Sequence, residues 1–130
     1  MVYTGTHDNE TLAGWAAGLS RAAKDQITPS LFDPRQTDKD LRKAVRHLAT
    51  TSCARTCIIP IQDHLGLPNT ARVNQPGTVG FNWRWRLVPG QEEEGLANQV
   101  KALTIRSNRA NWEILNEEAE ETDEAPEIDE

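Results

Sequence analysis

Apolar and polar positions divide the start of the chain into a strand and a helix. β-Branched and aromatic residues favour an extended strand over residues 1–8. Apolar residues then recur at the spacing of one helix face, which predicts a helix over residues 10–20 with Asn9 as its N-cap. The residues that carry these patterns are Val2, Tyr3 and Thr4 in the strand and Leu12, Trp15, Ala16 and Leu19 in the helix.

The next part of the chain is predicted to be a loop and a second helix. Two prolines favour a loop over residues 26–37. An amphipathic stripe then predicts a helix over residues 39–53, capped by Thr37 or Asp38. The stripe consists of Leu41, Val45, Leu48 and Ser52, at i, i+4, i+7 and i+11.

A second strand is predicted over residues 57–63. This short and almost wholly apolar run is typical of a parallel strand that is covered on both faces. Pro60 removes a donor from the strand ladder, so it must lie at a bulge or near the strand end. Gln62 and Asp63 then fall at the end of the strand, where β/α proteins place their chemistry.

The rest of the pattern gives a long loop and a third helix. Residues 64–90 are rich in Gly, Pro and Asn, and a loop of this length in a compact domain is usually functional. From about Gly95 an apolar face indicates a helix, carried by Leu96, Val100, Leu103 and Ile114. The order strand–helix–strand–helix makes two β/α units of an α/β protein. Because two strands do not make a stable sheet with helices on both faces, we expect the chain to be a piece of a larger fold.

Residues 83–86 read Trp-Arg-Trp-Arg and allow three interpretations. Aromatic rings that stack on bases, with Arg on phosphates, would make a nucleic-acid surface. Trp rings that pack on the apolar face of a pyranose would make a sugar surface. A strand with Trp inward and Arg outward also gives this alternation, and we prefer this interpretation.

Charge is distributed unevenly along the chain. The 130 residues carry a formal net charge of −6, yet residues 113–130 hold ten acidic residues and no Lys or Arg. The body before them is therefore basic. The tail, residues 116–130, has the composition of a disordered and solvated segment that either aids solubility or binds a partner. Its charge argues against nucleic-acid binding by the whole chain.

The remaining composition excludes a membrane protein and predicts a cytoplasmic one. No apolar run approaches the roughly 20 residues of a membrane span, and no secretory signal is recognisable. Cys53 and Cys57 are four residues apart without two further clustered ligands, so a metal site is not indicated. We expect both cysteines to be buried and reduced.

An imidazole stands beside a carboxylate at His7-Asp8, where the first strand passes into the first helix. From the residue types alone, both a structural pair and a functional pair remain open, and the position at a strand end favours function. A metal site that also uses Asp63 and His64 is a further alternative, which the spacing does not require. His47 is expected to face solvent.

Three segments carry a resemblance to a known family. Residues 2–11 read Val-Tyr-Thr-Gly-Thr-His-Asp-Asn-Glu-Thr, and residues 59–67 read Ile-Pro-Ile-Gln-Asp-His-Leu-Gly-Leu. Residues 69–87 include Asn-Thr-Ala-Arg-Val-Asn-Gln-Pro-Gly-Thr and then Gly-Phe-Asn-Trp-Arg-Trp-Arg-Leu. In this order they resemble the seventh strand, the eighth strand and the following loop of the 4-α-glucanotransferases. These enzymes are also called amylomaltases or disproportionating enzymes and form glycoside hydrolase family 77.

The resemblance implies a fold that the chain supplies only in part. The family's enzymes are several times longer and fold as a (β/α)8 TIM barrel. Residues 1–115 would be its last two β/α units, the C-terminal part of the catalytic barrel, while the acidic tail lies outside the resemblance. Three residues depart from the family pattern: Thr70 and Val73 stand where Glu and Met are frequent, and Phe81 where a smaller residue is common.

The resemblance also implies an activity. The family transfers α-1,4-glucan segments between maltooligosaccharide, starch or glycogen chains by retaining double displacement, without a metal or organic cofactor. Asp8 matches the carboxylate that stabilises the oxocarbenium-like transition state. His7 matches the histidine that binds the same sugar ring. Asn74, Pro76 and Gly77 match contacts to the acceptor glucan.

The family's nucleophile and acid/base lie on strands four and five, which this sequence does not contain. The chain alone is therefore expected to be inactive, with the N-terminal part of the barrel as its partner. Asp63 and Glu10 do not take over these roles, and Asp63 is expected to brace the barrel end. The alternative function is a non-catalytic barrel fragment that binds glucan or a partner protein.

Overall fold

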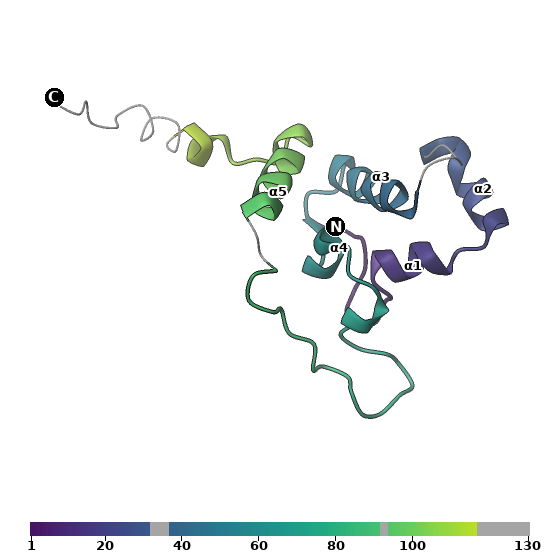
Figure 1. The fold of residues 1–130 in the computed structure, drawn as a ribbon. Coiled ribbons are helices and arrows are strands. Elements are labelled where there is room, and N and C mark those ends of the chain that lie inside the picture. Colours follow the sequence, from purple (N-terminus) through teal and green to yellow (C-terminus); the bar gives the residue numbers. More distant parts are fainter. Residues whose placement is uncertain (32–36, 92–93, 117–130) are drawn as a thin grey trace, which may run out of the picture.

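A computed structural model of the chain describes residues 1–31, 37–91 and 94–116. The elements follow in the order β1 (Val2–Tyr3), α1 (Leu12–Gly18), α2 (Arg21–Leu31), α3 (Asp38–Thr51), β2 (Cys57–Ile58), α4 (Ile61–Leu65), a 3₁₀ turn (Asn69–Ala71) and α5 (Glu94–Arg106) (Figure 1). A separate helical turn covers residues 112–116. The expected acidic tail lies, apart from residue 116, outside the described residues.

The two strands form a parallel pair. Val2 lies opposite Cys57 and Tyr3 opposite Ile58, and the connection between the strands contains α1, α2 and α3. This is the predicted β/α arrangement, although both strands are much shorter than predicted. The described residues are mostly helical and do not form a closed barrel.

One face of this sheet is open in the described part of the chain. Tyr3 is 47% exposed and Ile58, its partner in the register, is 45% exposed. The prediction that residues 57–63 form a strand covered on both faces is therefore wrong. Parallel strands are normally covered on both sides, and a sheet of two strands has too few neighbours to achieve this.

The second strand ends early because of Pro60. This residue precedes α4, and its carbonyl accepts hydrogen bonds from the amides of Asp63 at 2.9 Å and His64 at 3.3 Å. Gln62 and Asp63 are thus buried in a short helix, not placed at a strand end as predicted. A proline cannot donate to the strand ladder, but it is well suited to the start of a helix, where its missing N–H would have no partner.

Helix α2 was not predicted. Residues 26–31 of the expected loop are helical, because the helix continues for two residues beyond Pro29, and residues 32–36 lie outside the described residues. Ser20 caps its start, since its hydroxyl accepts a hydrogen bond from the amide of Ala23 at 3.2 Å. Pro29 therefore lies in the last turn of this helix and does not prevent the helix from forming.

Helix α5 also differs from the prediction, because it ends at Arg106. Asn108 adopts a positive φ of 53°, and the amide of Arg109 bonds to the carbonyl of Thr104 at 3.0 Å. This left-handed turn closes the helix, so Ile114 does not share its continuous face. The Arg109 guanidinium donates to the carbonyls of Ser52 and Ala54, at 2.9 and 2.8 Å, and to that of Thr50. These bonds tie the turn after α5 to the end of α3.

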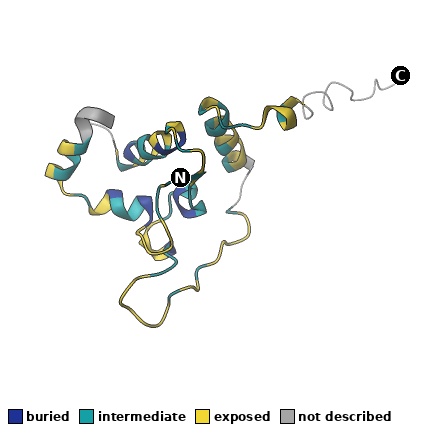
Figure 2. Cartoon of the chain, turned by 180° about the vertical axis from the view of Figure 1, so that it is seen from behind, coloured by how far each residue is buried: buried dark blue, intermediate teal, exposed yellow. Residues whose placement is uncertain are grey.

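The buried core lies mainly where α1 packs on α3 (Figure 2). The buried apolar residues are Leu12, Ala16, Leu41, Ala49 and Ala71. Larger apolar side chains are exposed, among them Leu48, Val79, Phe81, Val88, Trp112 and Ile114. None of the helices described is long and apolar enough to cross a bilayer. The expectation of buried cysteines is wrong: Cys53 is exposed and Cys57 half-buried, because residues 53–57 lie in a surface connection and at a sheet edge.

Gly14 is required by a close contact between α1 and the 3₁₀ turn. A Cβ at Gly14 would lie 2.0 Å from the Oδ1 atom of Asn69. That oxygen accepts a hydrogen bond from the Thr11 amide at 3.2 Å, and the Asn69 Nδ2 donates to Glu10 at 2.9 Å.

We expect Gly14→Ala to lower the free energy of unfolding by about 1–2 kcal/mol, because the displaced Asn69 loses these bonds and the gain in helix propensity offsets only part of the loss. Gly18→Ala is the matched control. No atom lies within 4 Å of its Cβ position, so this change should raise stability by up to about 1 kcal/mol. Urea unfolding measures both, and stabilisation by both changes would contradict the role of the Asn69 contact.

Candidate active-site corner

A tight turn presents His7 and Asp8 between β1 and α1. The Asn9 side chain accepts hydrogen bonds from the amide and the hydroxyl of Thr6, each at 2.8 Å, and the Asn9 amide bonds back to the Thr6 carbonyl at 3.1 Å. Asn9 therefore holds the turn, and it is not the N-cap of the helix as predicted. The cap is Thr11, whose hydroxyl accepts from the Gly14 amide.

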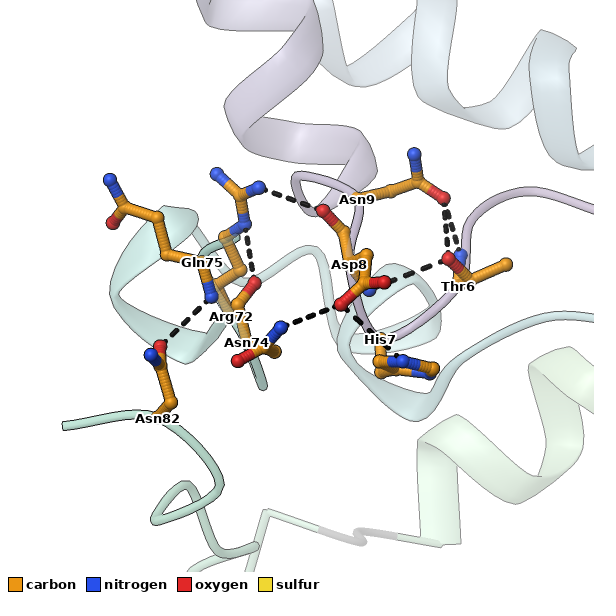
Figure 3. A network of polar contacts seen from close by, with 8 residues as sticks. All are labelled: Thr6, His7, Asp8, Asn9, Arg72, Asn74, Gln75 and Asn82. Atoms are coloured by element: carbon orange, nitrogen blue, oxygen red, sulfur yellow. Dashed lines mark hydrogen bonds and ion pairs between the residues drawn. The ribbon is translucent and has the colours of Figure 1, made fainter. Parts of the chain in front are cut away.

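His7, Asp8 and Asn74 come together at this turn (Figure 3). The His7 Nε2 lies 3.3 Å from the Asp8 Oδ1, and both side chains are about half exposed. The Asn74 Nδ2 donates to the same Asp8 oxygen at 2.6 Å, and the Asn74 amide donates to the His7 carbonyl at 3.1 Å. Residues 66 positions apart in the sequence thus form one polar corner, which we call the His7–Asp8 corner.

Arg72 fastens the long loop to this corner. Its Nη2 donates to the Asp8 carbonyl at 2.8 Å, and its Nε donates to the Asn74 carbonyl at 3.0 Å. The guanidinium therefore sets the backbone of both partners at once and leaves their side chains free to face solvent. It is a positioning residue for the corner.

Pro76 and Gly77 form a turn that projects from the corner. The Thr78 amide donates to the Gln75 carbonyl at 3.2 Å, and Gly77 has a φ of 77°. Proline followed by a residue with positive φ is typical of a type II turn, which favours glycine at that place. Asn82 supports the turn, because its Oδ1 accepts from the Gln75 amide at 2.9 Å. Pro76 and Gly77 are exposed and make no contact with Asp8 among the described hydrogen bonds.

The Trp83 ring contacts His7 at the corner, which the interpretation of residues 83–86 as a strand did not predict. Its ring lies 4.9 Å from the His7 ring, centroid to centroid, at 40°. Trp83 adopts a positive φ of 63° and remains 57% exposed, and its amide donates to the Val73 carbonyl at 2.7 Å. A strand with both Trp rings inward is therefore wrong, since the segment folds back on the loop and is not paired with a sheet.

Asp63 braces the connection that carries the corner. It is 3% exposed, and its Oδ1 accepts from the Leu12 amide at 2.7 Å while its Oδ2 accepts from the Thr4 hydroxyl at 2.6 Å. Thr4 follows β1 and Leu12 begins α1, so one carboxylate from α4 holds both ends of the loop that contains the turn. The predicted bracing role agrees with these contacts.

The corner is one wall and not an enclosed pocket. The hollow beside it has a volume of about 140 Å³, against roughly 300–1,000 Å³ for typical ligand sites. Its lining includes Gly5, Thr6, His7, Gln62, Asp63 and Arg72. A glucan would therefore need further protein surface to be enclosed at this place.

His64 does not join the corner. Its neighbour Arg46 donates to the His64 carbonyl at 3.4 Å, and the side chain is half-buried between α3 and α5. No group of three or more His, Cys, Asp and Glu side chains suited to a metal occurs within residues 1–31, 37–91 and 94–116. The alternative of a metal site from His7, Asp8, Asp63 and His64 is thus not supported by the geometry. His47 is exposed, as predicted.

The burial of His64 predicts a loss of stability in mild acid. Burial lowers the pKa of His64 below its ordinary value near 6.5, and the Arg46 charge lowers it further. Because the folded chain resists protonation, the stabilisation is complete above pH of about 6.5 and is lost as the pH falls towards the lower folded pKa. We expect His64→Gln to weaken the fall in unfolding free energy between about pH 7.5 and 5. His47→Gln, an exposed control, should retain it. An unchanged pH dependence in His64→Gln would contradict this cause.

The residues that build the corner match a known family. A family model described as 4-alpha-glucanotransferase matches residues 1–91, which contain the whole corner and both strands. The chain belongs to the 4-α-glucanotransferase family. The resemblance found in the three sequence motifs is thereby confirmed.

Individual 4-α-glucanotransferases show the same similarity. The enzyme of Thermus thermophilus is 36% identical over 84% of this chain, which is 22% of its own length. The chloroplastic/amyloplastic enzyme of Arabidopsis thaliana is 41% identical over 79% of this chain and 18% of its own length. A solved amylomaltase from Streptococcus agalactiae, in complex with acarbose, superposes with a TM-score of 0.70 at 31% identity. That match covers 85% of this chain and 22% of the amylomaltase.

The chain therefore spans about a fifth of the length of these curated 4-α-glucanotransferases. This proportion agrees with the two-stranded sheet of the described residues, which do not form a closed barrel. It also agrees with the open sheet face at Tyr3 and Ile58, which a larger fold of the same family would cover.

Three corner residues were predicted as site residues, Arg72 was not, and Trp83 was considered only within the sugar-surface interpretation of residues 83–86. His7, Asp8 and Asn74 were predicted, and the structure brings them together. Arg72 and Trp83 lie in the quoted motifs, but no local pattern indicates that their contacts are with the turn before α1. The sequence indicated only that Arg72 and Trp83 belong to a loop too long to be a simple connection, which suggests a functional segment.

Proposed function

We propose that this chain supplies the sugar-binding and transition-state-stabilising corner of a 4-α-glucanotransferase. The enzyme would transfer α-1,4-glucan segments between maltooligosaccharide, starch or glycogen chains by retaining double displacement. The observation that carries the proposal is the half-exposed Asp8 carboxylate, which Asn74 and His7 hold at 2.6 and 3.3 Å within the residues that match the family.

The charge and orientation of Asp8 suit this role. Both contacts involve Oδ1, and no described residue donates a hydrogen bond to Oδ2, which leaves that oxygen for sugar hydroxyls. A carboxylate near the reacting ring stabilises the positive charge that develops in an oxocarbenium-like transition state. Because Asn74 already fixes the carboxylate, little reorganisation is needed when this charge appears.

The neighbouring rings suit the apolar and polar sides of a sugar. The exposed Trp83 ring offers a flat apolar surface, and His7 beside it offers a ring nitrogen for a hydroxyl group. This arrangement supports the sugar surface that was one of the three interpretations of residues 83–86. Pro76 and Gly77, at the tip of the loop, would contact the acceptor glucan.

The chain supplies only part of the catalytic machinery in this proposal. Its hollow of about 140 Å³ is too small to enclose a glucan. The nucleophile and the acid/base would come from the part of the family's length that this chain does not match. The chain alone would then be inactive, and the rest of the barrel would be its partner.

The test is a chimera in which residues 1–115 replace the matching part of the Thermus thermophilus enzyme. We expect the chimera to release glucose from maltotriose, and the chain alone to release none above background. Turnover by the chain alone would contradict the partial-site proposal. A folded chimera without turnover would contradict the catalytic role, and maltoheptaose binding by the chain alone in calorimetry would instead support the alternative of a non-catalytic glucan-binding fragment.

A further inference from the structure

A second cavity, distant in sequence from the His7–Asp8 corner, lies between α3 and α5. Its volume is about 710 Å³, and we call it the basic cavity. All of its ionisable lining residues are basic, namely Lys43, Arg46, His47, His64 and Arg106, and no Asp or Glu belongs to the lining. Its apolar lining residues are Ala44, Leu96, Val100, Ala102 and Leu103. A cavity with this composition favours an anion that also carries apolar groups.

Arg46 is only partly satisfied beside the basic cavity. Its Nε is buried and has no hydrogen-bond partner among the described residues. Burial and the nearby Arg42 charge both lower the pKa of Arg46. The charge of Asp63 opposes this effect, but the two oxygens of Asp63 already accept from Thr4 and Leu12. The Arg46 Nη1 makes only a long hydrogen bond of 3.4 Å, to the His64 carbonyl. A partly buried guanidinium whose Nε has no partner is costly, and an oxyanion is the group that its planar donors fit best.

The same chain carries a dense source of oxyanions. Residues 117–130 contain nine acidic residues and no basic residue, and Ile128 stands between Glu127 and Asp129. A segment of this length can extend to about 46 Å at roughly 3.3 Å per residue, so the basic cavity is within reach of its attachment after α5. Because it is tethered, its effective concentration at the cavity is on the order of millimolar, well above that of most free anions.

We infer that the basic cavity binds the acidic segment of residues 117–130 of the same chain. Carboxylates of the segment pair with Arg46 and Arg106, and Ile128 packs on the apolar lining. The contact neutralises the excess positive charge of the groove between α3 and α5. It uses no residue of the His7–Asp8 corner, so it stands independently of the proposed function.

The test uses the full 130-residue chain with ¹⁵N labels. In one variant the nine acidic residues of 117–130 are replaced by Gln or Asn. We expect this variant to shift the Nε–H signal of Arg46 and the amide signals of Gln99 and Arg106. About 0.5 M NaCl should cause the same shifts in the unchanged chain, because screening weakens ion pairs.

Two single substitutions at exposed residues test the inference without the risk that the heavily substituted variant fails to fold. Arg106→Gln changes an exposed rim residue and should remove part of the salt-dependent shift. Lys39→Gln, on α3 but outside the cavity lining, should leave it unchanged.

Inorganic phosphate should bind the neutralised variant about tenfold more tightly than the unchanged chain, because the tethered competitor is gone.

Three results would overturn the inference. Cavity signals that do not move in the neutralised variant would show that the acidic segment is not bound there. Equal phosphate binding by both chains would assign the cavity to a free anion. Shifts that depend on protein concentration would show that the segment of another molecule is bound.

Discussion

Asp8→Asn in the chimera should lower kcat for maltotriose disproportionation by roughly 10²–10³-fold, the size of effect expected when one preorganised electrostatic group is removed. The substitution keeps an oxygen that can accept from Asn74. It removes the negative charge that, in our proposal, faces the reacting ring. Because that charge acts mainly in the transition state, kcat should fall far more than KM rises. Steady-state glucose release measures both constants.

The control for this result is Asp25→Asn, which removes an exposed carboxylate on α2, away from the corner. It should leave kcat within about twofold of the unchanged chimera, as expected of a surface substitution away from the site. The melting temperature of both variants should stay close to that of the unchanged chimera. A fall in kcat of less than tenfold in Asp8→Asn would remove Asp8 from the catalytic role.

Asp63→Asn has the largest expected effect on stability. The buried carboxylate accepts two hydrogen bonds, from the Leu12 amide and the Thr4 hydroxyl. An amide in its place turns one acceptor into a donor and removes the charge, so we expect a loss of about 2–4 kcal/mol in unfolding free energy. Thr4→Val, which removes only one donor, should cost about 1 kcal/mol.

Urea unfolding followed by circular dichroism measures these losses in the chain alone. Asp8→Asn is the matched control here, because its carboxylate is half exposed, and it should change the unfolding free energy by less than about 0.5 kcal/mol. A loss below this value in Asp63→Asn would contradict the bracing role. Substitution of Asp8 thus tests the catalytic role of the corner, whereas substitution of Asp63 tests the stability of the fold that carries it.

Hydrophobic periodicity predicted those elements that depend mainly on neighbouring residues in the sequence. The stripe on α3 was long and regular, and its predicted range agrees closely with Asp38–Thr51. Pro60 shortened the second strand and started a helix, a choice that depends on which neighbours are available to pair with the strand. Ile114 left the face of α5 because one left-handed residue, Asn108, ended the helix.

The sequence motifs identified individual residues of the candidate site. They did not predict contacts between residues that lie far apart in the sequence. His7 and Asp8 were singled out by their position at a strand end and Asn74 through the family resemblance. Neither spacing nor composition could have paired residues 66 positions apart. The contact of the tilted Trp83 ring with His7 depends on a positive φ that no residue preference predicts for tryptophan. Such contacts follow from the whole fold and not from any window of the sequence.

We propose that the turn after β1 and the long loop act on the glucan as one unit. A double-mutant cycle of Asp8→Ala, Asn74→Ala and the double variant in the chimera tests it most directly. Because Asn74 holds the Asp8 carboxylate, we expect the losses in log(kcat/KM) to be non-additive, with a coupling of about 1–3 kcal/mol. Additive losses, within about 0.5 kcal/mol, would contradict the claim that these two residues form one site.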